Sequence, residues 1–95
     1  MKKFELGQTV ITRGIAARIQ EDNEFGLFMM VSLERHKNGD WGNLCDEDKA
    51  LNDEALKDGN RLMSAYNRKD HPDDKIWIIT EADRSVTTVL FPNEY

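Results

Sequence analysis

The sequence has little of what marks secreted, membrane-spanning or disulfide-bonded proteins. Its 95 residues include a single cysteine, Cys45, so no internal disulfide can form and a reducing, cytoplasmic location is expected. No apolar run approaches the roughly 18 residues that a membrane-spanning helix needs. The basic residues Lys2 and Lys3 are not followed by the apolar segment of a signal peptide. We therefore expect a cytoplasmic protein without a membrane span.

Motifs of known catalytic or ligand-binding sites are also missing. Two histidines and one cysteine, without paired spacing, do not form a zinc-ligand pattern. Asp46 and Asp48 lack the glycine and the final glutamate of a calcium loop. There is no glycine-rich phosphate loop, and no nucleophile motif surrounds Ser64 or Ser85. We predict no metal, no cofactor and no catalytic residue, although groups that converge from distant positions leave no such trace in a sequence.

What the chain contains is typical of one small globular domain. With 39% hydrophobic and 33% charged residues, its length suffices for a single modest core. No internal repeat, low-complexity tract or linker divides it. We therefore treat residues 1–95 as one domain.

The strongest secondary-structure signal lies near the carboxyl terminus. Residues 76–79 and 86–91 are rich in Ile, Val, Thr, Trp and Phe and flank a polar stretch, residues 81–85, which predicts a β-hairpin. Residues 7–12 predict a first strand that ends at Arg13 and Gly14. Residues 61–66 fit either a further strand or a continued helix.

Helices are predicted in two places. Residues 15–20 repeat isoleucine at a spacing of four, and Thr12 before them is a suitable cap. Residues 46–58 begin with an acidic first turn, contain regularly spaced Ala and Leu, and end at Gly59.

Residues 25–36 are ambiguous. One helical face would hold Phe25, Phe28, Met29, Ser32, Leu33 and His36. Such a helix would end near Lys37, with Asn38 or Gly39 in the left-handed conformation. However, residues 27–31 form an unbroken apolar run, and Asn38-Gly39 is a strong hairpin signal. We predict a strand here, and hence an α+β fold with two or three helices packed on an antiparallel sheet that includes the C-terminal hairpin.

The negative charge of the chain is concentrated in one segment, residues 40–58. Its charged residues are Asp40, Asp46, Glu47, Asp48, Asp53, Glu54 and Asp58, against Lys49 and Lys57. The segment thus carries −5, which equals the net charge of the whole protein. A segment with this charge repels phosphate backbones. Because the sequence also has no basic stripe and no helix-turn-helix pattern, we expect no direct nucleic-acid binding. It is either a solvated helix face or a surface for a basic partner protein.

Two turns are further candidate sites. In residues 35–42, glycines bracket Asp40 and Trp41 and predict a tight turn. Trp41 would either fill the core or anchor a partner. The charged turn at residues 81–84 is either solvated or functional in the same way. The candidate binding residues are His36, Asp40, Trp41, Asp46, Glu47, Asp48, Asp53, Glu54, Glu81, Asp83 and Arg84.

Residues along most of the chain from Phe4 onward carry a resemblance to a known family. They are found in segments 35–36, 39–42, 52–53, 64–66, 77–84, 87–92 and 94–95, of which the C-terminal block is the most specific. In these residues the chain resembles small proteins labelled "plasmid-related protein", which occur on bacterial plasmids, integrated elements and phages. The resemblance implies a cytoplasmic accessory protein of a mobile genetic element and assigns no catalytic residues.

The expected function is therefore protein–protein binding. On a mobile element, the acidic segment would suit an inhibitor of host defence, of the anti-CRISPR or anti-restriction type, that occupies a basic groove. The alternative is an enzyme or small-ligand-binding protein with a pocket near Asp40, Trp41, Glu81 and Asp83.

Overall fold

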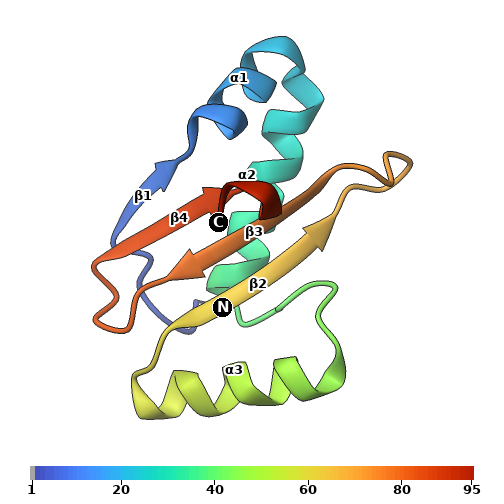
Figure 1. Ribbon diagram of the computed structural model, residues 1–95. Helices are drawn as coiled ribbons and strands as arrows, with labels where there is room; N and C mark the ends of the chain where they lie inside the picture. Colours follow the sequence, from blue (N-terminus) through green and yellow to red (C-terminus); the bar gives the residue numbers. More distant parts are fainter. Residues whose placement is uncertain (1) are drawn as a thin grey trace.

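The computed structural model describes residues 2–95 and shows helices and a four-stranded sheet in one α+β domain (Figure 1). The elements are β1 (Gln8–Ile11), α1 (Arg13–Glu21), α2 (Asn23–Lys37), α3 (Asp46–Asp58), β2 (Leu62–Asn67), β3 (Lys75–Thr80), β4 (Val86–Leu90) and the 3-10 helix η1 (Pro92–Glu94). The fold class that the sequence predicts is confirmed.

The sheet has the strand order β1-β4-β3-β2. Its three C-terminal strands pair antiparallel, and β3 and β4 form the predicted hairpin, in which Ile78 lies opposite Val89. Residues 62–67 form a strand, which settles the choice left open for that segment. β1 is also a strand, as predicted, but it pairs parallel to β4, with Val10 opposite Thr88. No local turn joins β1 to β4, so the sequence contains no signal for this pairing.

Residues 25–36 belong to the helix α2, and our prediction of a strand was wrong. The buried residues of α2 lie three or four positions apart, which is the spacing of one helical face: Phe25, Met29, Ser32, Leu33 and His36. The Asp22 side chain accepts hydrogen bonds from the amides of Glu24 and Phe25, and Gly39 after the helix has φ of +81°. Asn38-Gly39 therefore ends a helix here instead of closing a hairpin.

The other two helices were correctly predicted. Thr12 caps α1, where its hydroxyl accepts a hydrogen bond from the amide of Ile15. α3 begins with an acidic turn that suits the helix dipole, and Gly59 follows it with φ of +75°. The N-cap of α1 at Thr12 and the end of α3 at Gly59 are short, local motifs, which is why the sequence reveals them.

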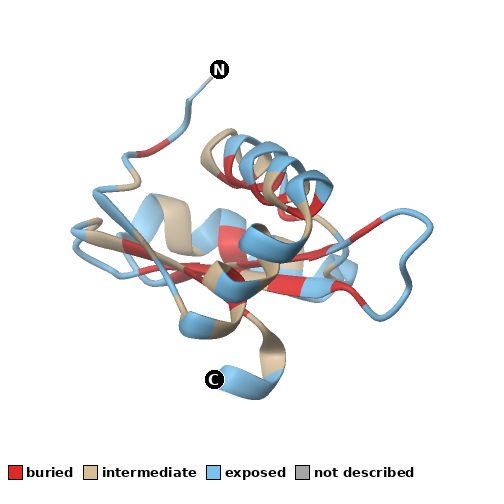
Figure 2. Cartoon of the chain, turned by 90° about the horizontal axis from the view of Figure 1, so that it is seen from above, coloured by how far each residue is buried: buried red, intermediate tan, exposed pale blue. Residues whose placement is uncertain are grey.

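α2 packs across one face of the sheet, and α3 lies along the edge formed by β2 (Figure 1). Seen from above, the carboxyl terminus with η1 lies on the opposite side of the sheet (Figure 2). The main core lies between α2 and the sheet and contains Ile15, Phe25, Met29, Leu33, Tyr66, Ile76, Ile78 and Val89. Within residues 2–95 no helix has the length and apolar character to cross a bilayer.

The outer edge of β2 is covered by the segment that precedes it. The Asn52 amide on α3 donates to the carbonyl of Met63 and accepts from its N–H, at 2.6 and 3.2 Å. The amide of Asn43 donates to the carbonyl of Ala65 at 2.7 Å. These bonds satisfy backbone groups that would otherwise form an exposed sheet edge, and they fix α3 to the domain.

Candidate functional site

The solvent side of α3 is an acidic surface that includes an exposed leucine. We call it the acidic face and define it by Asp46, Glu47, Asp48, Leu51, Asp53, Glu54 and Asp58, all of which are exposed. The side chain of Leu51 is 62% exposed and lines a shallow hollow with Glu47, Ala50 and Glu54. Spacings of three and four place these four residues on one side of the helix.

The opposite side of α3 holds the helix rigidly in place. Asn52 is buried against β2, and Ala55 and Leu56 pack against the small core cluster around Leu62. At the end of the helix, Arg84 donates to the carbonyl of Ala55 at 3.3 Å. A guanidinium at a helix C-terminus is stabilised by the helix dipole. The acidic face is therefore presented on a fixed element and not on a mobile loop.

None of the carboxylates of the acidic face forms an ion pair within residues 2–95. Asp53 has a neutral partner, because its Oδ1 accepts a hydrogen bond from Nε1 of Trp41 at 2.9 Å. Some carboxylates elsewhere are used by the fold: Asp74, for example, binds Arg18 and Arg68 at 2.7 and 3.0 Å. The carboxylates of α3 thus have no ion-pair partner in the part of the chain that the structure describes.

His36 lies in a buried chain of hydrogen bonds between α2 and the sheet. Its Nδ1 is 2.5 Å from Oγ of Ser64, and its Nε2 is 2.9 Å from Oγ1 of Thr80. Oγ1 of Thr80 is 2.7 Å from Oγ1 of Thr87, which donates to the carbonyl of Leu6 at 2.6 Å. A carbonyl only accepts, so the hydroxyl of Thr87 donates to it and the hydroxyl of Thr80 donates to Thr87. Nε2 of His36 therefore carries the proton of the ring and donates to Thr80.

This direction leaves Nδ1 of His36 as the acceptor of the Ser64 hydroxyl, with no place for a second proton. Burial, together with the nearby positive charge of Arg84, lowers the pKa of His36 to about 3. Ser64 and His36 are the residue types of a nucleophile and its base, but both are fully buried and no substrate can reach them. The network is structural, and His36 is not accessible to a partner.

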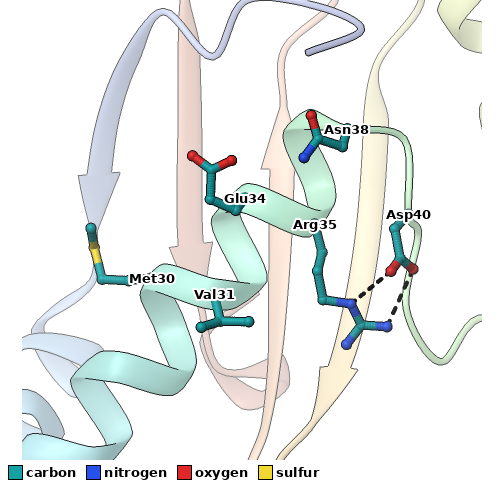
Figure 3. A pocket seen from close by; sticks show the side chains of 6 residues that line it. All are labelled: Met30, Val31, Glu34, Arg35, Asn38 and Asp40. Carbon is teal, nitrogen blue, oxygen red and sulfur yellow. Dashed lines mark hydrogen bonds and ion pairs between the residues drawn. The ribbon is translucent and has the colours of Figure 1, made fainter. Parts of the chain in front are cut away.

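Trp41 fills the core, which is one of the two roles considered for it. It is buried, and its ring stacks on Phe4 with 6.1 Å between the ring centroids. Asp40 is exposed and binds Arg35 on α2, with 2.7 Å between Oδ2 and Nε (Figure 3). This hydrogen bond lowers the pKa of Asp40 below its usual value. The turn therefore anchors the end of α2 to the core.

The charged turn between β3 and β4 is also tied to the fold. Asp83 accepts hydrogen bonds from the amide and the hydroxyl of Ser85 at 3.0 and 2.6 Å. Arg84 donates to the carbonyl of Asn60 at 2.6 Å. Glu81 is exposed and lies 3.9 Å from Arg61. Asp83 and Arg84 thus stabilise the turn and the end of α3.

The hollow that contains Asp40 is not lined by the other three residues of the alternative pocket. Trp41 meets β2 at Ala65, whereas Glu81 follows Thr80, the partner of Leu62. At a rise of about 3.3 Å per residue, Ala65 and Leu62 are about 10 Å apart. The hollow that contains Asp40 is lined instead by residues of α2 and its end: Met30, Val31, Glu34, Arg35 and Asn38 (Figure 3).

Some of these features leave a signal in the sequence and others do not. Leu51 was missed as a surface residue, although its spacing from Glu47 and Glu54 would have placed it on the polar side of the predicted helix. The partners of His36 could not have been found, because Ser64 and Thr80 are 28 and 44 residues away in the chain. Within residues 2–95, no group of three or more His, Cys, Asp or Glu side chains is placed to hold a metal ion.

Comparison with models of protein families, with curated proteins and with solved structures finds no match for this chain. Its function must therefore be inferred from the surfaces of the domain itself. The acidic face is the surface on which the largest number of predicted site residues meet.

Proposed function

We propose that the protein acts by binding another protein through the acidic face of α3. The observation that carries this proposal is that the exposed carboxylates of α3 form no ion pair within residues 2–95, and that two of them, Glu47 and Glu54, line one hollow with the exposed Leu51. The partner would present a basic surface with an apolar recess for Leu51. The charges would steer the encounter and set its orientation, and burial of the leucine would add about 1.5–3 kcal/mol.

The dimensions of α3 suit a groove that normally binds nucleic acid. A helix of 13 residues is about 20 Å long at a rise of 1.5 Å per residue. Over that length, double-stranded DNA carries one negative charge about every 1.7 Å. α3 is less densely charged, so it would occupy such a groove with the help of its leucine and not by charge alone.

The resemblance to plasmid-related proteins adds a biological setting to this proposal. In that setting the protein is a cytoplasmic accessory factor of a mobile genetic element. Its partner would be a nuclease or another host defence protein of the CRISPR or restriction type, whose basic groove the acidic face blocks. This step rests on the resemblance, whereas the protein-binding surface rests on the geometry of α3.

The proposal is tested by capturing partners from a lysate of the native host with the tagged protein, after nuclease treatment. The test variant neutralises the acidic face with Asp46→Asn, Glu47→Gln, Asp48→Asn, Asp53→Asn and Glu54→Gln. Asn at position 53 keeps an acceptor for Trp41. The control variant makes the same change of net charge elsewhere on the surface, with Glu5→Gln, Glu21→Gln, Asp70→Asn, Asp73→Asn and Glu81→Gln.

We expect a stoichiometric partner with the wild-type protein, lost at high salt and with the test variant but kept by the control variant. Circular dichroism establishes that both variants are folded. Equal capture by all three proteins would contradict the proposal, because binding would then not depend on the acidic face. Equal loss in both variants would show that only the net charge of the protein matters.

A further inference from the structure

A carboxylate near the C-terminal end of the chain joins η1 to the start of α1. Oε1 of Glu94 accepts hydrogen bonds from the hydroxyl of Thr12 at 2.6 Å and from the amide of Phe91 at 2.9 Å. Oε2 of Glu94 accepts from the amide of Gly14 at 3.1 Å, although the two residues are 80 positions apart in the chain. Thr12 is the N-cap of α1, and the positive end of a helix dipole favours a carboxylate there.

The missing side chain of Gly14 makes room for this carboxylate. A Cβ at residue 14 would lie 2.6 Å from Oε2 of Glu94 and 3.1 Å from Cδ2 of Phe91. Gly14 lies inside α1 and does not have a positive φ, so its backbone does not require glycine, which is a poor helix former. The hydrogen bond from Thr12 is the main cause that lowers the pKa of Glu94 below its usual value, so the site holds the ionised form.

The contact with α1 keeps the C-terminal residues over a tryptophan of the sheet. η1 lies on the side of the sheet opposite α2 (Figure 2). Trp77 points to the same side, because its neighbours Ile76 and Ile78 belong to the core that faces α2. The ring of Tyr95 meets the ring of Trp77 edge-on, with 5.7 Å between the centroids.

The segment that makes these contacts is itself little buried. η1 contains no buried residue, and the side chain of Tyr95 is 70% exposed. Leu90, at the end of β4 just before this segment, is by contrast buried. A segment with few buried apolar contacts opens locally at a much lower free energy than the whole domain. The attachment of η1 therefore depends on its carboxylate more than on apolar packing.

We propose that η1 is a clasp: the carboxylate of Glu94 between Thr12 and Gly14 closes it, and loss of that contact frees residues 92–95 while the domain stays folded. In the open state the outer side of Trp77 and the amide of Gly14 become accessible. Tryptophan side chains are frequent at protein interfaces, and amides at a helix N-terminus bind anions. The closed clasp thus hides two groups that the open state offers to other molecules.

Backbone order parameters, measured by NMR on the full-length chain, test this proposal. In the wild type we expect values near about 0.85 for residues 93 and 94, as in a rigid backbone. Glu94→Ala removes the carboxylate and should lower them below about 0.6, the range of a flexible segment, with β3 and β4 unchanged. Asn93→Ala, in the same segment, is the matched control and should leave η1 ordered.

Gly14→Ala is a second variant, which leaves the sequence of η1 intact. Its methyl group fills the space of the carboxylate, so residues 93 and 94 should become flexible although Glu94 is present. Alanine favours a helix more than glycine does, so α1 should stay ordered. Gly26→Ala in α2 is the control, because a Cβ there would meet no atom closer than 3.4 Å. It should leave η1 ordered.

Flexible residues 93 and 94 in the wild type overturn the proposal, because the clasp would then not be closed. Ordered residues in either Glu94→Ala or Gly14→Ala also overturn it, since the contact with α1 would not hold the segment. Loss of order throughout β3 and β4 in Glu94→Ala shows that the clasp does not open separately from the domain, and overturns it too. None of these results bears on the acidic face, which lies on α3, so the two proposals fail separately.

Discussion

At the scale of single residues, the carbonyl of Leu6 sets the state of His36. Since that carbonyl accepts the hydroxyl of Thr87 at 2.6 Å, the chain of donors runs in one direction and ends at a neutral imidazole. All members of this network have partners, and no buried side-chain nitrogen or oxygen in residues 2–95 lacks one. A satisfied polar network inside a core specifies one arrangement of its elements, here α2 against β2, β3 and β4.

This network predicts how stability depends on pH. The pKa of His36 is lowered to about 3 in the folded state, from 6.5, so between these values the unfolded chain binds the additional proton. Stability is therefore fully present above pH 6.5 and decreases as the pH falls, by up to about 1.4 kcal/mol per pH unit. Urea unfolding of the wild type and of His36→Gln from pH 7.5 downward measures this. The variant should be less stable at neutral pH but should show a flatter dependence; an unchanged slope would contradict the assignment.

At the scale of elements, glycines with positive φ end helices and turn the chain, but they differ in what surrounds them. Gly42 has φ of +77° and lies against the carbonyl of Ala65 and the ring of Tyr66. Gly59 has φ of +75°, and a Cβ there would meet no atom within 4 Å. The first glycine lets the segment before α3 approach β2 closely, and the second only ends α3.

The two glycines make a matched pair of substitutions. Gly59→Ala should cost about 1–2 kcal/mol, the conformational cost of a left-handed residue with a side chain. Gly42→Ala should cost more than about 3 kcal/mol, since its Cβ would also lie about 2.6 Å from the Tyr66 ring and displace the cover of β2. The free energy of unfolding in urea measures both. Equal losses would show that the close approach of this segment to β2 does not matter for stability.

How much of the fold the sequence could predict depends on whether a feature is formed by neighbouring residues or by distant segments. The cap at Thr12, the acidic start of α3 and the C-terminal hairpin are local patterns, and all three are confirmed. α2 was missed because Asn38-Gly39 and the apolar run at 27–31 suggested a strand, whereas long-range packing of Phe25 and His36 decides for a helix. The parallel pairing of β1 with β4 and the network of His36 join distant segments, so no local pattern records them.

At the scale of the whole molecule, the domain separates its internal and external roles. The ion pairs and buried hydrogen bonds hold α1, α2 and the strands together, while the carboxylates of α3 form no ion pair among residues 2–95. The chain carries a net charge of −5, all of which is accounted for by residues 40–58, and α3 contains most of that segment's charged residues. Partner binding is thus assigned to the acidic face of α3.

Site-specific photo-crosslinking in the native host tests this assignment most directly. A photoreactive amino acid replaces Leu51 on the acidic face, or the exposed Lys69 as a control. We expect an adduct with a different protein from position 51 and none from position 69. The absence of a protein adduct at position 51, or the same adduct at both positions, would contradict the central claim that α3 is the partner-binding surface.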